Sequence, residues 1–162
     1  MKRTSLAGML VLACSVATAA APPFGFNLDI TLSARAAERL RATKEGITVS
    51  ARYYGDPTPR TQKHANEVGQ IDLGGETLRL PGHAGRARFS GKQILAGRLG
   101  WIQGSAKVNV NVYSSRRSNK DNVLSCDMID TDVAQVVKVQ PITLHCALIE
   151  ENVPTESKPN QP

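Results

Sequence analysis

Apolar and polar residues alternate with a period of two in three stretches of the chain, a pattern typical of strands that bury one face. These stretches are residues 24–32, 47–54 and 106–113. Their inward positions are Phe24, Phe26, Leu28, Ile30 and Leu32, then Ile47, Val49, Ala51 and Tyr53, then Ala106, Val108, Val110 and Val112. The third stretch is β-branched on its apolar side, which favours a strand further. We therefore expect a half-buried strand over each range.

The segment between the first two strands carries the signals of one short helix. Ser33 is a favourable N-cap, and Ala36, Ala37 and Leu40 share one face at helical spacing. Gly46 is of the residue type that commonly ends helices. The domain is thus predicted to begin with a strand, a helix and a second strand.

Further short elements are indicated along the rest of the chain. Residues 69–80 alternate on both sides of Gly74-Gly75, which predicts a hairpin whose turn lies at the two glycines. We also expect short strands at 86–90 and around 123–129, and a last strand at 142–148. Residues 93–99 are compatible with a helical turn.

The number and spacing of these elements favour a mainly β fold, an antiparallel two-layer β-sandwich of about seven or eight strands with one short helix near the N-terminus. An incomplete barrel is the alternative. A length of 162 residues leaves room for one such domain, which we place at residues 20–150. Residues 151–162 are polar and contain three prolines, so a disordered tail is expected there.

The N-terminus has the pattern of a secretory signal peptide. Lys2 and Arg3 precede an apolar run at 6–16, which is too short for a spanning helix of ~20 residues, and small residues follow. A cut after Ala19 would make residues 1–19 the signal peptide and place the protein in the periplasm of a Gram-negative bacterium or outside the cell. The alternative is that residues 11–14 form a lipobox, so that an acylated Cys14 anchors a lipoprotein to the membrane.

The cysteines predict one structural disulfide. Cys14 lies in the signal peptide or at its processing site, which leaves Cys126 and Cys146 as the internal pair. An oxidising compartment favours a bond between them. Two buried free thiols are the alternative. No Cys-x-x-Cys spacing is present to suggest a redox function.

Charge and motifs argue against several classes of function. Removal of Lys2 and Arg3 lowers the formal net charge from +6 to +4, so the exported chain is mildly basic and no nucleic-acid partner is expected. The three histidines, His64, His83 and His145, lack the spacing of metal ligands, and no nucleophile elbow or phosphate-binding loop occurs. We therefore predict no catalytic residues, no metal and no cofactor, and an enzyme would need a cleft with converging acids or histidines.

Two polar loops, expected at 54–66 and 114–121, are the candidate contact surface, and the second is expected to be mobile. Tyr and Arg are frequent at protein interfaces, because they bury much area or form paired hydrogen bonds. The candidate partner-binding residues are Tyr53, Tyr54, Asp56, Arg60, Tyr113, Arg116 and Arg117. The alternative is that Tyr53 belongs to the core and that the arginines only keep the protein soluble.

These features favour a non-enzymatic periplasmic protein that binds another protein in the bacterial envelope. The expected role is that of an inhibitor or immunity protein that blocks an envelope-acting toxin or a wall-degrading enzyme. The alternative is a structural or assembly factor of the envelope, which acylation at Cys14 would favour.

Overall fold

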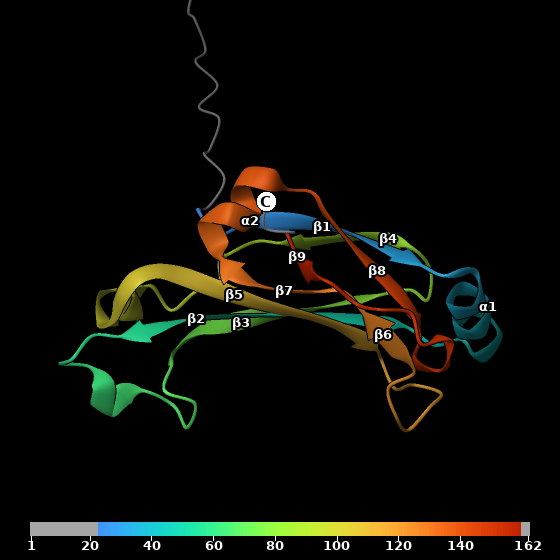
Figure 1. Cartoon of the computed structure of the whole chain (residues 1–162), viewed down its shortest axis with the longest axis horizontal. Helices are drawn as coiled ribbons and strands as arrows, with labels where there is room; N and C mark the ends of the chain where they lie inside the picture. Colours follow the sequence, from blue (N-terminus) through green and yellow to red (C-terminus); the bar gives the residue numbers. More distant parts are fainter. Residues whose placement is uncertain (1–22, 160–162) are drawn as a thin grey trace, which may run out of the picture.

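The computed structural model describes residues 23–159, which form two β-sheets lying one above the other (Figure 1). The strands are β1 (Phe26–Leu32), β2 (Ile47–Pro57), β3 (Ile71–Leu80), β4 (Gly85–Phe89), β5 (Ile102–Ser114), β6 (Leu124–Cys126), β7 (Met128–Asp132), β8 (Ile142–Leu148) and β9 (Ser157–Lys158). The helices are α1 (Ala34–Thr43) and α2 (Val133–Val139), and short 3-10 turns are η1 (Gln62–His64), η2 (Ala96–Trp101) and η3 (Ile149–Glu151).

One sheet has the strand order β4-β1-β8-β6 and the other β3-β2-β5-β7-β9. The predicted mainly β class is confirmed, but the expectation of purely antiparallel sheets is wrong. Strands β1 and β8 are parallel, and so are β7 and β9, which makes both sheets mixed. The described residues contain nine strands and two α-helices, one helix more than expected. Helix α2 was missed because its run of valines also suits a strand.

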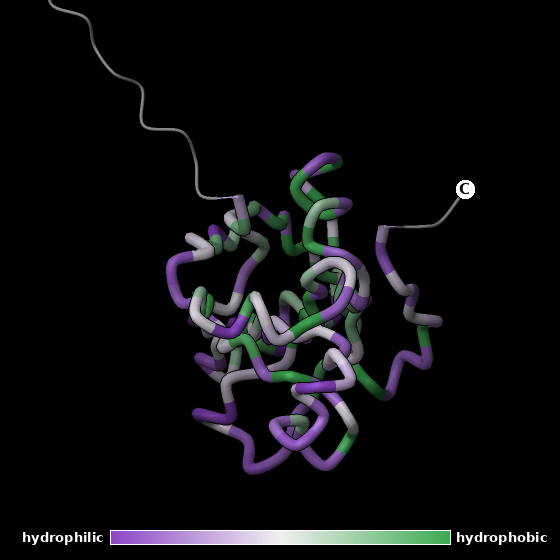
Figure 2. Tube along the Cα trace, turned by 90° about the vertical axis from the view of Figure 1, so that its left-hand side faces the viewer, coloured by the Kyte–Doolittle hydropathy of each residue, from purple (hydrophilic) through white to green (hydrophobic). Residues whose placement is uncertain are grey.

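The apolar positions of the alternating stretches face one another between the two sheets. Leu28 and Leu144 from one sheet and Val49 and Val110 from the other are fully buried members of one hydrophobic cluster. The loops on the lower side of Figures 1 and 2 are mostly hydrophilic. The period of two in the sequence therefore corresponds to a core that both sheets share.

Helix α1 lies at one end of the two layers (Figure 1) and begins at the predicted cap. The Ser33 hydroxyl oxygen accepts a hydrogen bond from the Ala36 N–H at 3.0 Å. Ala36 and Leu40 are buried against the sheets. The helix ends at Thr43, and its C-cap Lys44 is in the left-handed region at φ 55°, two residues before the glycine that the sequence suggested.

The predicted hairpin at residues 69–80 is wrong, because β3 runs through both glycines as one edge strand. Its pairing with β2 shifts register, with Arg52 opposite Gly75 and Tyr54 opposite Asp72. Gly74 has φ +94°, and an extra residue at this point forms a β-bulge instead of a turn. A hairpin turn and a β-bulge both favour glycine at positive φ, so the local sequence did not distinguish the two.

Substitution of Gly74 by alanine is expected to lower the free energy of unfolding by about 2 kcal/mol. A Cβ at this position would lie 2.5 Å from the carbonyl oxygen of Gln93, in a backbone conformation that side chains disfavour. Denaturant unfolding measures the change. Gly97→Ala is the control, since a Cβ there meets nothing within 4 Å. Equal stability of the two variants would contradict the proposed bulge.

Asp127 connects the two sheets where the chain passes from β6 to β7. Its carboxylate accepts hydrogen bonds from the backbone N–H of His145 at 3.0 Å and of Glu156 at 2.8 Å. Its own N–H donates to the His145 carbonyl oxygen at 2.9 Å. A single buried residue thus joins β8 to the segment that leads into β9.

The expectation of disorder from residue 151 onward is wrong for residues 151–159. The Glu151 carboxylate accepts hydrogen bonds from the Ser33 hydroxyl at 2.6 Å and the Leu148 N–H at 2.7 Å. Further on, β9 pairs with β7 in parallel. Long-range backbone pairing holds this polar segment, and local composition does not report such pairing.

The predicted signal peptide at residues 1–19 and the alternative acylation site at Cys14 lie outside the described residues. Within residues 23–159, neither helix has the length and apolar character needed to cross a membrane.

Candidate functional site

The outer face of the five-stranded sheet lies open between two projecting loops (Figure 1). In the described part of the chain, no α-helix covers this face of β2, β3 and β5. The loops, residues 58–70 and 115–123, project from the same side at opposite ends of the face. We call this surface, with its two loops, the open face.

Side chains of the open face come from alternate positions of adjacent strands. Tyr54 of β2 is directly opposite Lys107 of β5, and Arg52 is opposite Asn109, which in turn is opposite Asp130 of β7. Because Tyr53 lies between Arg52 and Tyr54 in the strand, its side chain faces the core instead.

A polar network occupies the middle of the open face. The Tyr54 hydroxyl donates to the Asp130 carboxylate at 2.5 Å, and the Lys107 ammonium donates to Asp56 at 2.8 Å. Burial and the Asp130 hydrogen bond raise the pKa of Tyr54, while the hydrogen bond to Asp56 raises the pKa of Lys107. Tyr54 therefore stays protonated and Lys107 stays charged at neutral pH.

The loop at one end of the open face is anchored by Glu45, the residue that follows the C-cap of α1. Glu45 is only 2% exposed, and its carboxylate accepts hydrogen bonds from the backbone N–H groups of Arg117 at 3.0 Å and Ser118 at 2.8 Å. Gly46 N–H, Asn119 N–H and the Ser118 hydroxyl are further donors. The loop expected to be mobile is thus fixed through its backbone.

The protonation of Glu45 reflects this cluster of donors. Burial alone would raise the pKa of this carboxyl group. The N–H groups of Arg117, Ser118 and Gly46 outweigh burial and lower the pKa from 4.5 to about 2. Glu45 is therefore an anion throughout the neutral range, and the N–H groups of the loop stabilise its charge.

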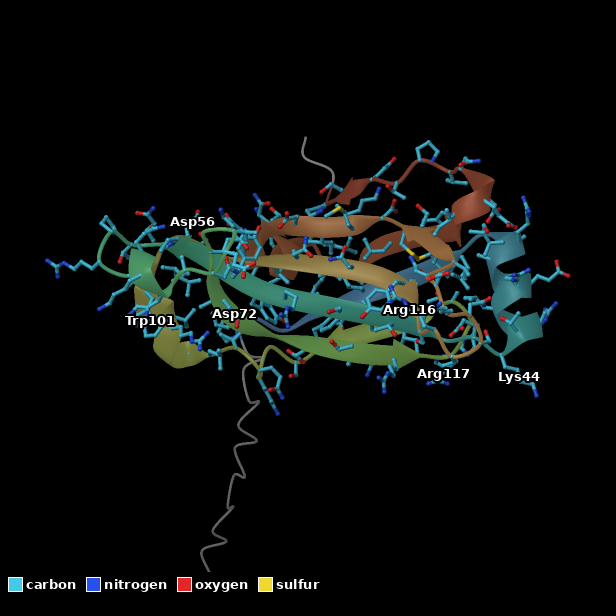
Figure 3. All side chains as sticks on the ribbon, turned by 90° about the horizontal axis from the view of Figure 1, so that it is seen from below. Lys44, Asp56, Asp72, Trp101, Arg116 and Arg117 are labelled. Carbon is cyan, nitrogen blue, oxygen red and sulfur yellow. A yellow bond between two sulfur atoms is a disulfide. The ribbon has the colours of Figure 1, made fainter. Side chains whose placement is uncertain are left out.

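Cations gather around this anchored loop. Lys44, Arg116 and Arg117 lie at the same end of the open face (Figure 3), and all three are exposed. Arg41, Lys44, His83 and Arg117 also line a hollow of about 420 Å³ whose apolar lining includes Leu40 and Pro81. We call Arg41, Lys44, His83, Arg116 and Arg117 the basic end. Among residues 23–159, none of its members forms an ion pair.

The loop at the other end of the open face is tied to η2. The Thr61 hydroxyl donates to the Trp101 carbonyl oxygen at 2.6 Å, and the His64 ring stacks on the Trp101 ring at 4.5 Å between centroids. Arg60 lies in this loop and is exposed. It is therefore at the opposite end of the face from Arg116 and Arg117.

The predicted contact residues divide between the open face and the core. Tyr54, Asp56 and Tyr113 occupy outward positions of β2 and β5, so the first two belong to a strand and not to the expected loop. Tyr53 is removed from the set, because it is fully buried and its hydroxyl donates to the Phe24 carbonyl oxygen at 3.4 Å. The alternation of β2 already placed Tyr53 on the buried side.

Sequence reasoning missed several residues of this surface. Arg52, Lys107, Asn109 and Asp130 line it, and the outward positions of the alternating strands would have identified the first three. No signal in the sequence pointed to Glu45, because its partners lie more than 70 residues further along the chain.

The three histidines do not form one site. His64 stacks on Trp101, the His83 Nδ1 lies 2.8 Å from the Ala84 carbonyl oxygen, and the His145 Nδ1 lies 3.1 Å from the Thr31 hydroxyl. Within residues 23–159, no group of three or more His, Cys, Asp or Glu residues is placed to hold a metal ion. The disulfide between Cys126 and Cys146 is present, as predicted, between β6 and β8.

Comparison with protein families, with curated proteins and with solved structures finds no match to this chain. The functional argument therefore depends on the geometry and charge of the open face.

Proposed function

We propose that the chain is a non-enzymatic binding protein of the bacterial envelope that blocks another protein, as an inhibitor or immunity protein does. The observation that supports this most directly is the anchoring of Arg116 and Arg117 on a loop whose backbone Glu45 holds in place. A loop backbone that is fixed before binding loses little conformational entropy when a partner docks. A two-layer β scaffold thus presents a preorganised surface.

The charge of the basic end supports a partner with an acidic surface. Arg41, Lys44, Arg116 and Arg117 are exposed cations, whereas Glu45 lies buried beneath the loop, so positive charge predominates at this surface. Such a cluster accelerates association with an oppositely charged surface and disfavours a basic one. The proposed partner is an extracytoplasmic protein, a toxin or wall-degrading enzyme, with an acidic patch that covers the basic end.

Charge reversal at Arg116→Glu and Arg117→Glu is expected to weaken binding at least tenfold, because it places two anions opposite the acidic patch. The free energy of unfolding should change by less than ~0.5 kcal/mol, since both side chains are exposed and the Arg117 N–H remains available to Glu45. Affinity capture from envelope extract identifies the partner, and binding to the purified partner is then measured at two salt concentrations.

The matched control is Arg88→Glu with Lys92→Glu, two exposed cations on and just after β4 in the other sheet. Support requires one stoichiometric partner whose activity the wild-type chain suppresses, with loss of both effects in the Arg116 and Arg117 variant only. Equal binding by that variant, recovery of envelope assembly complexes, or no partner at all would overturn the proposal.

A further inference from the structure

The open face contains a second hollow, which lies between the polar network in its middle and the 58–70 loop, away from the basic end. It has a volume of about 480 Å³, which lies within the ~300–1,000 Å³ range of small-ligand pockets. Arg52, Tyr54, Asn109 and Asp130 contribute from the strands, and Asn66 and Gln70 from the 58–70 loop. Asp72 of β3 also lines it, and Figure 3 shows this residue in the left half of the view, away from Arg116 and Arg117.

Hydrogen bonds within the chain hold two of the amide side chains around this hollow, and each of these bonds uses only the oxygen of the amide. The side-chain oxygen of Asn66 accepts hydrogen bonds from the backbone N–H groups of Val68 at 3.1 Å and Gln70 at 2.9 Å. Among residues 23–159, its side-chain NH₂ group remains as a donor. The side-chain oxygen of Asn109 accepts a hydrogen bond from the side-chain NH₂ of Asn111, so within the described residues the Asn109 NH₂ group also remains as a donor. These contacts orient the side chains and leave their second hydrogen-bonding group for a ligand.

Arg52 and Asp130 add a strong donor and a strong acceptor. Arg52 is exposed and, within the described residues, its guanidinium has neither an ion pair nor a hydrogen-bond acceptor. Asp130 receives the Tyr54 hydroxyl on one oxygen, and its second oxygen has no donor among residues 23–159. The lining therefore offers several N–H donors beside a carboxylate acceptor, on rigid strands.

The charges of the lining favour a neutral ligand. Asp72 is compensated by Arg98, whose guanidinium nitrogen lies 3.5 Å from its carboxylate, and Arg52 offsets Asp130 in formal charge. An anionic ligand would meet two carboxylates, and a cationic ligand would meet the Arg52 guanidinium. A neutral ligand with many hydroxyl groups can donate to Asp130 and accept from Arg52, Asn66 and Asn109 at once.

We propose that this hollow binds a neutral saccharide. Sugar hydroxyls act both as donors and as acceptors, which matches the mixed lining, and Tyr54 adds an aromatic ring to that lining. A peptide would instead need apolar pockets for its side chains, and the side chains that line this hollow are polar or aromatic. The site is separate from the basic end and does not depend on the proposed protein partner.

Titration calorimetry on the full processed chain tests this site with soluble probes. The neutral probes are chitotriose, cellotriose, maltotriose and lactose, and the comparison probes are sialyllactose and a capped neutral tripeptide. At least one neutral saccharide is expected to bind. Arg52→Ala and Asn109→Ala should each weaken that binding at least tenfold, since each removes donors to the same ligand.

Two controls separate the saccharide site from other effects. Arg88→Ala removes an exposed arginine from the other sheet, and the charge reversal at Arg116 and Arg117 removes the proposed protein contact. Both should bind the saccharide as the wild type does. Failure of every neutral probe, preference for sialyllactose or the tripeptide, or unchanged binding by Arg52→Ala and Asn109→Ala would overturn the inference and leave the proposed protein binding untouched.

Discussion

Replacement of Glu45 by alanine is expected to lower the free energy of unfolding by about 3–5 kcal/mol, because it removes a buried carboxylate that accepts hydrogen bonds from several N–H groups. The donors include the N–H groups of Gly46, Arg117 and Ser118, at 2.8–3.0 Å from the carboxylate. The effect should be centred on the loop that carries Arg116 and Arg117. Denaturant unfolding gives the total loss, and hydrogen exchange at the Ser118 amide reports the loop.

The same carboxylate predicts how stability depends on pH. A pKa lowered from 4.5 to about 2 corresponds to roughly 3 kcal/mol that favours the folded state when Glu45 is ionised. Because the folded state holds the proton more weakly than the unfolded chain, this contribution is fully present above pH 4.5. It is lost as the pH falls from 4.5 to about 2.

The Glu45→Gln variant should lose this part of the acid sensitivity, since it has no carboxyl group to protonate. Glu38→Ala is the matched control, because Glu38 is an exposed acid of α1 and its loss should cost less than ~0.5 kcal/mol. A Glu45→Ala loss below about 1 kcal/mol would show that the loop is not held as the structure indicates.

Local periodicity predicted the strands that bury one face in the core. It failed where pairing with a strand distant in the sequence determines the local structure. Residues 26–30 of β1 and 108–112 of β5 follow their alternation, since every second side chain there enters the shared core. The end of β2 was assigned to a loop because Gly55-Asp56-Pro57 has the composition of a turn. In the structure, Asp56 pairs with Gln103 and Pro57 with Ile102, so a partner strand outweighs local turn chemistry.

Gly55 lies in an extended strand, at a position where the neighbouring strand leaves no room for a side chain. A Cβ at this position would lie 2.6 Å from the Ile102 side chain, so the close approach of β5 excludes a larger residue. Glycine in a sequence therefore marks a turn, a bulge or a close contact, and only the three-dimensional neighbours show which of the three applies.

The candidate site was predictable in residue type and only partly in position. Tyr and Arg residues were selected as contact residues, and outward positions of β2 and β5 do bring Tyr54, Asp56 and Tyr113 to one face. The anchoring of the loop was not predictable, because an acid at a helix end is solvated in most proteins and nothing nearby in sequence marks its distant donors.

Removal of the disulfide with Cys126→Ala and Cys146→Ala is expected to lower the free energy of unfolding by about 3 kcal/mol. The bond spans 20 residues, which include β7 and α2, so it restricts the unfolded chain over a substantial loop. It also holds β6, a three-residue edge strand whose sheet partner is β8.

Chain produced in an oxidising compartment should show no reactive thiol at Cys126 or Cys146 when it is denatured without reductant. Addition of reductant should expose both thiols. Reduction of the folded protein should also lower the free energy of unfolding as much as the double substitution does, because either treatment removes the covalent link between β6 and β8. Hydrogen exchange should rise first in β6 and at His145, whose N–H donates to Asp127 next to the bond. Two thiols in the unreduced protein, or a double variant within about 1 kcal/mol of the wild type, would show that the sheet holds this edge without covalent help.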